Sequence, residues 1–547
     1  MSTSSDRTFH EFFRAASSRL PRKLALTADG TPHTYEELWE KSGWLAKSFL
    51  RMGVEPGDRL GLWLPNSMEL ILAFLATART GAIGVSINTR FRKNELSYIL
   101  PHSGISILIC PEEFLGFNYY HLLKEVAPDL RAIPSRECTT SYIPSLRKIL
   151  ITSTPPPSGA AVFGEILEEG KFLPSQALQN AEKTVQPDDT YILMYTSGST
   201  STPKGVLLKH SSCTRKPSAL AKHLGLGPRE RFYTAMPLCH AAGLFSGWWL
   251  AVAVGAPFFT HSRFSPETAL ECLSKERITV ERSFPTLVKD QLNFLIKNPD
   301  GFDLSSLRTG LASSLSADIF KDMESHLGPH QFVNNYGFTE ATGVVCLSHP
   351  TDPPEIRWGK MGKPLKGMEV KVSNPETGRP YPANQEGEIM VKGWAMMKGY
   401  HDPSLNVTPA FDSDGWFHSG DLGILDREGN LTYLGRLRER LRVGGENVSP
   451  EEVGIFLRRH PAVEAAEVFG IPDGRLGEVP AVAVRREVGS SLSESELIDF
   501  CRDRIAGFKI PRHIYFVETM PLNSSNKINR KKLRQDLLDI LNLDENQ

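Results

Sequence analysis

The sequence contains few cysteines, and their arrangement excludes two classes of cross-linked protein. Seven cysteines occur among 547 residues, and no two of them are separated by only two residues. Disulfide frameworks need paired cysteines, and zinc sites usually contain closely spaced pairs. Because the number is odd and the spacing wide, we expect reduced thiols and a cytoplasmic location.

The sequence also lacks an excess of charge of either sign. Its 62 lysines and arginines nearly balance its 63 aspartates and glutamates, giving a formal net charge of −1. Nucleic acids and anionic membrane surfaces are bound through clustered positive charge. Neither is therefore expected as a partner, and a homodimer is left open.

Long hydrophobic runs are scarce as well. The most continuous apolar segment, residues 244–259, is shorter than the roughly 18–20 residues that span a bilayer. We predict a buried core helix there and no integral membrane segment. Residues 1–6 are polar, without the basic and then apolar layout of a signal peptide.

Amphipathic helical patterns alternate with short apolar runs along most of the chain. Thr34 and Glu37 form a capping-box pattern that predicts the start of a helix. An apolar run at 59–64 precedes a helical pattern at 67–80. Further strand patterns lie at 84–87, 105–109 and within 278–288. This alternation is typical of an α/β fold with layered, mostly parallel sheets.

A domain boundary is predicted near residue 436. Residues 415–425 and the segment after the turn at 426–430 read as a hairpin, and residues 436–442 are highly charged. A charged connector without proline suits a hinge. We therefore expect a large N-terminal domain, residues 1–436, and a small mobile C-terminal α+β domain, residues 437–547.

Residues 195–205, YTSGSTSTPKG, resemble a loop that binds phosphate. Backbone amides and hydroxyls can surround phosphate oxygens, and a lysine supplies compensating charge. A Walker-type loop is excluded, because Pro203 and Gly205 stand where glycine and serine or threonine are needed. The alternative for the segment alone is a surface turn.

Three other segments carry side chains that suit nucleotide chemistry. Residues 336–340, YGFTE, combine an aromatic ring for a purine with a glutamate for Mg²⁺, which prefers one or two carboxylates plus phosphate oxygens. Residues 419–421, SGD, place a carboxylate on a turn. Lys527 lies in a polar segment. Taken singly, a helix cap, an Asx turn and a solvated lysine are the simpler interpretations.

In this order, the segments resemble the adenylate-forming superfamily of acyl-CoA synthetases, luciferase-like enzymes and peptide-synthetase adenylation domains. Residues 195–205 match its pattern Y-T-S-G-T-T-G-x-P-K-G with serines at 199 and 201. Its Y-G-x-T-E and T-G-D patterns match 336–340 and 419–421. Its G-R-x-K-D-x-I hinge matches 435–441, and its late lysine motif matches 525–527. The likeness covers nearly the whole chain.

The resemblance implies a two-step ligation. A carboxylate attacks the α-phosphate of ATP, giving an acyl-adenylate and pyrophosphate, and a thiol then displaces AMP. Glu340 and Thr200 would bind Mg²⁺, Thr339 would contact the α-phosphate, and Tyr336 would stack on adenine. The β- and γ-phosphates would be bound by Thr196, Ser197, Gly198, Ser199, Thr200 and Lys204.

The resemblance also assigns roles near the C-terminal domain. Asp421 and Arg436 would bind the ribose hydroxyls. Lys527 would bridge the carboxylate and the α-phosphate oxygens, so it is the expected catalytic lysine. Glu439 would be the pivot of a domain rotation. After that rotation, Gly444 and Gly445 would admit the thiol.

The acyl-CoA synthetase branch is favoured, with CoA as the thiol. Residues 448–451 and 237–243 resemble that branch, and we expect His240 to line the carboxylate pocket, with a hydrogen-bonded core histidine as the alternative. The other pocket candidates are mostly apolar, which favours a fatty or aryl acid. They are Met236, Phe245, Trp248, Phe284, Gly310, Leu311, Asn335 and Val344.

Some positions depart from the family pattern, and other functions remain open. Ser201 and Asn526 replace glycines, and Gly454 stands where the family usually has glutamate. The departures remove no catalytic charge. The alternatives are transfer to a carrier protein, luciferase-like oxidation of the adenylate, and a nucleotide-binding homologue with weak catalysis.

Overall fold

The computed structural model describes residues 6–541 apart from a few short segments. These are 197–202, 300, 314–316, 329–330, 403–409, 440, 444–445, 474, 503 and 524–527. The chain forms two compact units. The first comprises Met1–Glu369 and Gly393–Ala410, and the second Val370–Lys392 and Phe411–Gln547. The predicted boundary after residue 436 stays a prediction.

The first unit contains a nine-stranded sheet whose interior strands are parallel. Strand pairing at both edges is antiparallel. Across the sheet, the order is β2 (Thr31–Thr34), β1 (Leu24–Ala28), β15 (Phe258–Thr260), β14 (Phe232–Tyr233), β16 (Val280–Ser283), β17 (Thr309–Ser313), β18 (Gln331–Phe338), β19 (Gly343–Leu347) and β20 (Lys363–Pro364).

A second sheet of eight strands lies in the same unit. Its strands are parallel from β11 to β12, and the last two pairings are antiparallel. The order is β11 (Ala161–Val162), β10 (Lys148–Ile151), β5 (Ile105–Cys110), β3 (Arg59–Leu62), β4 (Ile83–Ser86), β12 (Thr190–Thr196), β13 (Lys204–Lys209) and β23 (Gly399–Tyr400). Two small hairpins complete the strands: β6 (Glu113–Phe114) with β7 (Phe117–Asn118), and β8 (Arg131–Ile133) with β9 (Glu137–Thr139).

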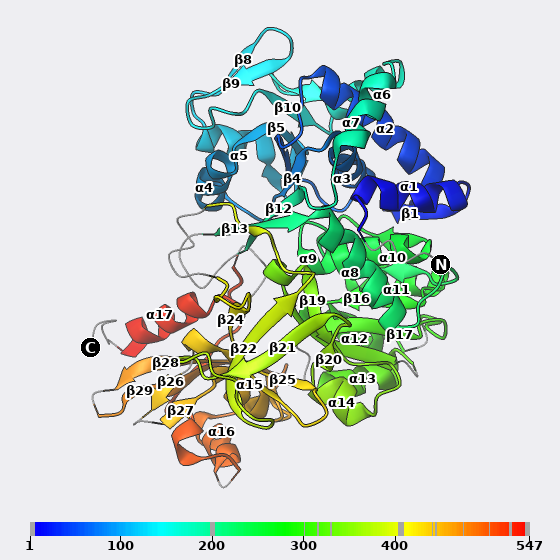
Figure 1. The fold of residues 1–547 in the computed structure, drawn as a ribbon. Coiled ribbons are helices and arrows are strands. Elements are labelled where there is room, and N and C mark those ends of the chain that lie inside the picture. The colour runs from blue at the N-terminus through cyan, green and yellow to red at the C-terminus, as the bar shows by residue number, and fades with distance from the viewer. Residues whose placement is uncertain are drawn as a thin grey trace. The chain divides into compact units, whose positions relative to one another are not determined.

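The helices of the first unit follow the predicted alternation with strands (Figure 1). They are α1 (Phe9–Arg19), α2 (Tyr35–Arg51), α3 (Met68–Thr80), α4 (Lys93–Ser103), α5 (Tyr119–Val126), α6 (Phe163–Lys171), α7 (Gln176–Thr184), α8 (His210–His223), α9 (Ala241–Gly243), the π-helical turn η1 (Leu244–Trp248), α10 (Trp249–Val254), α11 (Pro266–Lys275), α12 (Pro285–Lys297), α13 (Ala317–His326), the 3₁₀ turn η2 (Thr339–Ala341) and α14 (Pro354–Gly359).

Two local expectations can be compared with these helices. The capping box at Thr34 and Glu37 is confirmed at the start of α2. The apolar run 244–259 is buried almost throughout, as predicted. It is helical only in its first part, so the prediction of one helix over the whole run is wrong. Gly255, with φ of 69°, ends α10, and the run continues into β15. In the part of the chain that the structure describes, every helix is too short or too polar to span a bilayer.

The described residues of the second unit form one antiparallel sheet, one mixed sheet and three α-helices. The predicted hairpin after residue 415 is confirmed as β24 and β25. The first sheet has the order β21 (Met368–Ser373), β22 (Glu386–Gly393), β24 (Phe417–Leu425) and β25 (Leu431–Arg436). The second has β27 (Glu446–Val448), β26 (Leu441–Val443), β29 (Gly477–Arg486) and β28 (Val463–Asp473), with β30 (His513–Phe516) parallel to β29. The helices are α15 (Pro450–Leu457), α16 (Glu494–Cys501) and α17 (Arg530–Leu541), with 3₁₀ turns at η4 (Leu437–Glu439) and η5 (Gly507–Lys509).

Strand β16 carries two buried charged residues in succession, Glu281 and Arg282. Successive side chains of a strand point to opposite faces of the sheet. Glu281 accepts a hydrogen bond of 2.9 Å from the Gln291 side chain on α12. Arg282 donates to Ser246 of η1 on the opposite face, at 3.1 Å. Burial raises the pKa of the Glu281 carboxyl to about 7.

Glu281→Gln is expected to raise the thermal midpoint at pH 8 and to leave it nearly unchanged at pH 5. A carboxyl whose pKa is higher in the folded state loses stability as the pH rises from about 4.5 to about 7. The neutral amide removes that loss. Differential scanning calorimetry at both pH values measures it, with Glu271→Gln, an exposed glutamate, as control. Equal shifts of the midpoint at the two pH values would contradict the prediction.

Candidate functional site

Strands β12 and β13 contain the two ends of the predicted phosphate loop, residues 195–205. They pair antiparallel, with Tyr195 opposite Gly205 and Thr196 opposite Lys204. The Thr196 hydroxyl lies 3.5 Å from the Lys204 carbonyl oxygen. The two ends of the predicted loop are therefore fixed side by side in one hairpin. The predicted residues Ser197, Gly198, Ser199 and Thr200 lie outside the described residues.

His102 supports the end of β12, and no pattern in the sequence pointed to this histidine. Its Nδ1 lies 2.7 Å from the Tyr195 hydroxyl, and its carbonyl oxygen is 3.1 Å from Nε2 of His401. Burial and the neighbouring His401 lower the pKa of His102, which keeps the imidazole neutral. The end of α4 thereby connects β12 to the segment that follows β23.

Tyr400 brings together two predicted site residues from distant parts of the sequence. Its hydroxyl donates to Oε1 of Glu340 at 3.0 Å. The Nζ atom of Lys204 lies 5.0 Å from the centre of its ring, within the range of a cation–π interaction. Pairing of β23 with β13 fixes this position in the sheet. A cation and a carboxylate thus both contact one tyrosine, the cation at its ring and the carboxylate at its hydroxyl.

The segment 336–340 owes its shape to a close backbone approach. Strand β18 ends at Phe338, and Thr339 and Glu340 lie in η2. A Cβ atom at Gly337 would lie 2.2 Å from the Gly343 carbonyl oxygen, so only glycine fits. Tyr336 is buried, with its ring 5.8 Å from that of Phe338. The glycine of this motif is required by packing within the strand pair.

His240, just before α9, is fixed by residues at the end of β4 and immediately after it. Its Nε2 lies 3.2 Å from Nδ2 of Asn88, and the Ser86 hydroxyl donates to the carbonyl oxygen of Cys239 at 2.9 Å. The His240 side chain is half-buried. It is thus hydrogen-bonded and also partly accessible, so both interpretations of this histidine remain.

The other pocket candidates are mostly buried. The Phe245 ring lies beside Gly343: a Cβ atom added to Gly343 would be 3.5 Å from the Phe245 ring. Asn335 donates from its amide to the Ala312 carbonyl oxygen at 2.7 Å. A Cβ on Gly310 would lie 2.3 Å from the Phe332 ring. Fully or nearly fully buried candidates are Met236, Phe245, Trp248, Leu311, Asn335 and Val344.

Two buried basic residues lie beside these candidates and escaped the sequence analysis. Arg282 donates to the Leu311 carbonyl oxygen at 2.8 Å, and burial lowers its pKa to about 10. Lys216 donates to the Val344 carbonyl oxygen, and burial lowers its pKa to about 7. For Arg282, the charged pair Glu281 and Arg282 inside the predicted strand region 278–288 was the available signal.

In the second unit, the structure pairs Asp421 with Arg436. They are opposite each other on β24 and β25, and Arg436 Nε lies 3.1 Å from Oδ1 of Asp421. The aspartate is buried, whereas the arginine is largely exposed. Arg436 also donates to the Ser419 carbonyl oxygen at 3.2 Å. Two residues predicted for the ribose are thus neighbours.

Glu388 holds the turn that precedes Asp421, and the sequence analysis missed it. Its carboxylate is buried on β22 and accepts from the Gly420 backbone amide at 3.0 Å. Its other oxygen lies 2.9 Å from Nδ1 of His418. Gly420 has a φ of 67°, a conformation that favours glycine. An acidic residue inside an apolar strand was the signal available.

Phe284, the last of the pocket candidates, is the N-cap of α12 and is half-buried. Of the predicted site residues within 437–547, the structure describes Glu439 alone. It ends η4 and forms an ion pair with Arg530. Gly444, Gly445 and Lys527 lie outside the described residues.

Comparisons with known proteins place the chain in a family. The AMP-binding enzyme family matches residues 12–401, and its C-terminal domain family matches residues 452–527. The mitochondrial medium-chain acyl-CoA ligase ACSF2 of Rattus norvegicus is 31% identical over 98% of this chain and 89% of its own length.

Solved structures of the same fold cover nearly all of the chain. The anthranilate CoA ligase AuaEII with anthranoyl-AMP has a TM-score of 0.86 at 25% identity, covering 98% of both chains. The o-succinylbenzoate coenzyme A synthetase MenE of Bacillus subtilis, with ATP and magnesium ion, has a TM-score of 0.78 at 27% identity, covering 95% of this chain and 98% of its own. The predicted fold class is confirmed: a large N-terminal domain of layered sheets and helices with a smaller C-terminal domain.

Gly337→Ala is expected to weaken ATP binding about tenfold, because the added methyl group would force β18 away from Gly343 at a cost of about 1–3 kcal/mol. Isothermal titration calorimetry with ATP measures the change. Gly359→Ala is the matched control, since a Cβ there meets nothing within 4 Å. Equal affinities of the two variants would show that the close approach is not needed for the site.

Proposed function

Because the chain belongs to the AMP-binding enzyme family, we propose that it joins a carboxylic acid to CoA with ATP as energy source. In the first step, a carboxylate oxygen bonds to the α-phosphorus of ATP and pyrophosphate leaves. In the second, the CoA sulfur bonds to the acyl carbon and AMP leaves, while the thiol proton passes to solvent. The overall products are acyl-CoA, AMP and pyrophosphate.

The observation that carries this proposal is the grouping of Lys204, Tyr400 and Glu340 beside the β12–β13 hairpin. Attack of an anion on a polyanion needs neutralised charge and alignment more than it needs a protein nucleophile. Lys204 supplies a positive charge, and the hydrogen bond from Tyr400 orients the carboxylate of Glu340. These residues would hold the triphosphate in a fixed position.

The residues around Glu340 fit a magnesium ion. A carboxylate can accept more than one contact, so Glu340 can bind a cation beside its hydrogen bond from Tyr400. Mg²⁺ needs few protein ligands when phosphate oxygens supply the others. The ion would be bound by Glu340, with Thr200 proposed as a second ligand. When bound, it would neutralise phosphate charge.

The nucleoside end of ATP would be bound by Tyr336, Asp421 and Arg436. Asp421 is an acceptor for hydroxyl groups, and Arg436 and the turn held by Glu388 fix its orientation. Thr339 would contact the α-phosphate. Lys527 would offset the charge that develops between the acid and that phosphate.

The acid would be fatty or aryl. Buried apolar and aromatic side chains near His240, including Phe245 and Trp248, favour such a tail. The names of the relatives agree with this class, since one is a medium-chain acyl-CoA ligase and one an anthranilate CoA ligase. The rat relative is named as mitochondrial, so a cytoplasmic location and a homodimer stay predictions.

A panel of straight-chain acids, benzoate and anthranilate with ATP and CoA is expected to release AMP for at least one acid. No AMP from any acid would overturn the proposal. Pyrophosphate exchange without thioester formation would favour a carrier protein or luciferase-like oxidation.

Lys527→Ala is expected to lower pyrophosphate exchange about 100-fold, because a charge that stabilises the transition state is removed. Lys531→Ala, which changes an exposed lysine nearby in the sequence, is the control.

Tyr400→Phe is expected to raise the Mg²⁺ concentration for half-maximal activity about tenfold. The variant keeps the ring beside Lys204 and removes only the hydrogen bond to Glu340. Activity titrated with Mg²⁺ at fixed ATP measures the effect, and Tyr142→Phe, an exposed tyrosine, is the control. An unchanged titration curve would rule out a role for this hydrogen bond.

A further inference from the structure

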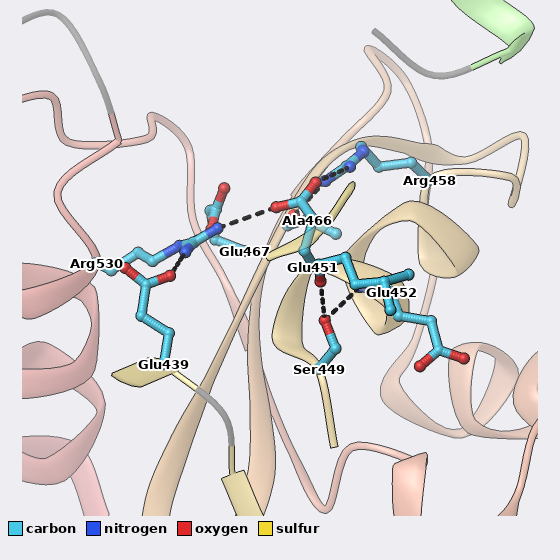
Figure 2. A network of polar contacts seen from close by, with 9 residues as sticks. Glu439, Ser449, Glu451, Glu452, Arg458, Ala466, Glu467 and Arg530 are labelled. Atoms are coloured by element: carbon cyan, nitrogen blue, oxygen red, sulfur yellow. Dashed lines mark hydrogen bonds and ion pairs between the residues drawn. The ribbon is translucent and has the colours of Figure 1, made fainter. Parts of the chain in front are cut away.

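One guanidinium in the second unit binds three carboxylates from three different elements (Figure 2). Arg530 Nε lies 2.6 Å from Glu467 of β28, and one terminal nitrogen lies 3.2 Å from Glu451 of α15. The other terminal nitrogen is paired with Glu439, the last residue of η4. All three nitrogens of the side chain are used, each on a different glutamate.

The cluster has more negative than positive charge. Besides Arg530, Arg458 contacts it and lies 3.2 Å from Glu451. Arg458 also donates to the Ala466 carbonyl oxygen at 3.0 Å. Two guanidiniums therefore form ion pairs with three carboxylates. Although burial opposes it, the charges of Glu467 and Glu439 raise the pKa of Arg530 above its ordinary value. Without Arg530 the three carboxylates would repel one another.

Two residues of the cluster lie close in sequence to predicted site residues. Arg530 is the first residue of α17 and comes three positions after Lys527. Glu439 comes three positions after Arg436, which contacts Asp421. The helix is anchored further along by Leu533, Leu537 and Leu538, which pack on Phe469 and Ile471. Arg530 is thus the ionic connection between the start of α17 and the segment with the proposed pivot.

We propose that Arg530 is a positioning residue for the adenylation step. It fixes the start of α17, and with it the attachment point of the Lys527 segment, to Glu439 and to β28. The inference rests on the proposed function, in which Lys527 acts in adenylation and not in thioester formation. Removal of the guanidinium would then impair the first step more than the second. Lysine cannot replace it, because one ammonium cannot bind three carboxylates at fixed angles.

The test compares the two steps in full-length variants. Adenylation is measured as ATP–pyrophosphate exchange with octanoate or anthranilate, whichever the wild type accepts. Thioester formation is measured from the corresponding synthetic acyl-adenylate and CoA. Arg530→Gln is expected to lower the ratio of the first rate to the second about 10- to 100-fold. Arg530→Lys is expected to recover only a small part of the ratio.

Arg458→Gln is the matched control. This residue is an arginine of similar exposure in the same cluster. It contacts Glu451 and the Ala466 carbonyl oxygen, whereas Glu439 is paired with Arg530. Its variant is expected to keep the wild-type ratio, even if its thermal midpoint falls. A ratio that changes equally in Arg458→Gln and Arg530→Gln would mean a structural role only and would overturn the inference.

Glu439→Gln tests the same bond from its other end and serves also if Arg530→Gln does not fold. It is expected to lower the ratio in the same direction, and the double variant should be no worse than the more impaired single variant. Additive effects, or an unchanged ratio, would overturn the inference. If the wild type adenylates no acid of the panel, the proposed function fails, and the inference falls with it.

Discussion

The hydrogen bond from Tyr400 to Glu340 is the interaction on which the first unit's site depends. It joins two segments sixty residues apart, and it exists because β23 pairs with β13 at the edge of the eight-stranded sheet. The same pairing sets the Tyr400 ring beside Lys204. Lys204 of β13 and Glu340 of η2 therefore both contact one residue of β23. Because these contacts fix their spacing, the charged groups would need little reorganisation in the proposed binding of a triphosphate.

Carboxylates in this protein are positioned by neighbours that differ in each case. Glu340 has a tyrosine hydroxyl, Asp421 has the guanidinium of Arg436, and Glu388 has a backbone amide and a histidine. Hydrogen bonds and opposite charges favour the ionised carboxylate, whereas burial without a charged partner disfavours it. Glu281 illustrates the second situation, since its hydrogen bond comes from a neutral amide. Burial depth alone does not decide how such a group behaves.

Much of the architecture was predictable because it depends on local patterns. The capping box at Thr34 and the β24–β25 hairpin each follow from a few consecutive residues. The roles of Tyr400 and Glu388 depend on strand pairings between segments far apart in the sequence, which no local pattern encodes. The apolar run at 244–259 shows the same limit, since hydrophobicity predicted its burial but not the change from α10 to β15 at Gly255.

The chain passes between the two units three times, after residues 369, 392 and 410. Strand β23 with Tyr400 thus lies in a stretch of first-unit chain that is bounded at both ends by second-unit chain. A single cut after residue 392 or after residue 410 would leave residues 1–369 of the first unit covalently joined to residues 370–392 of the second. Neither unit is one continuous stretch of the chain. A continuous fragment that contains all of one unit therefore also contains part of the other. The stretch that carries Tyr400, the hydrogen-bond partner of Glu340, is thus continuous at each end with polypeptide of the second unit.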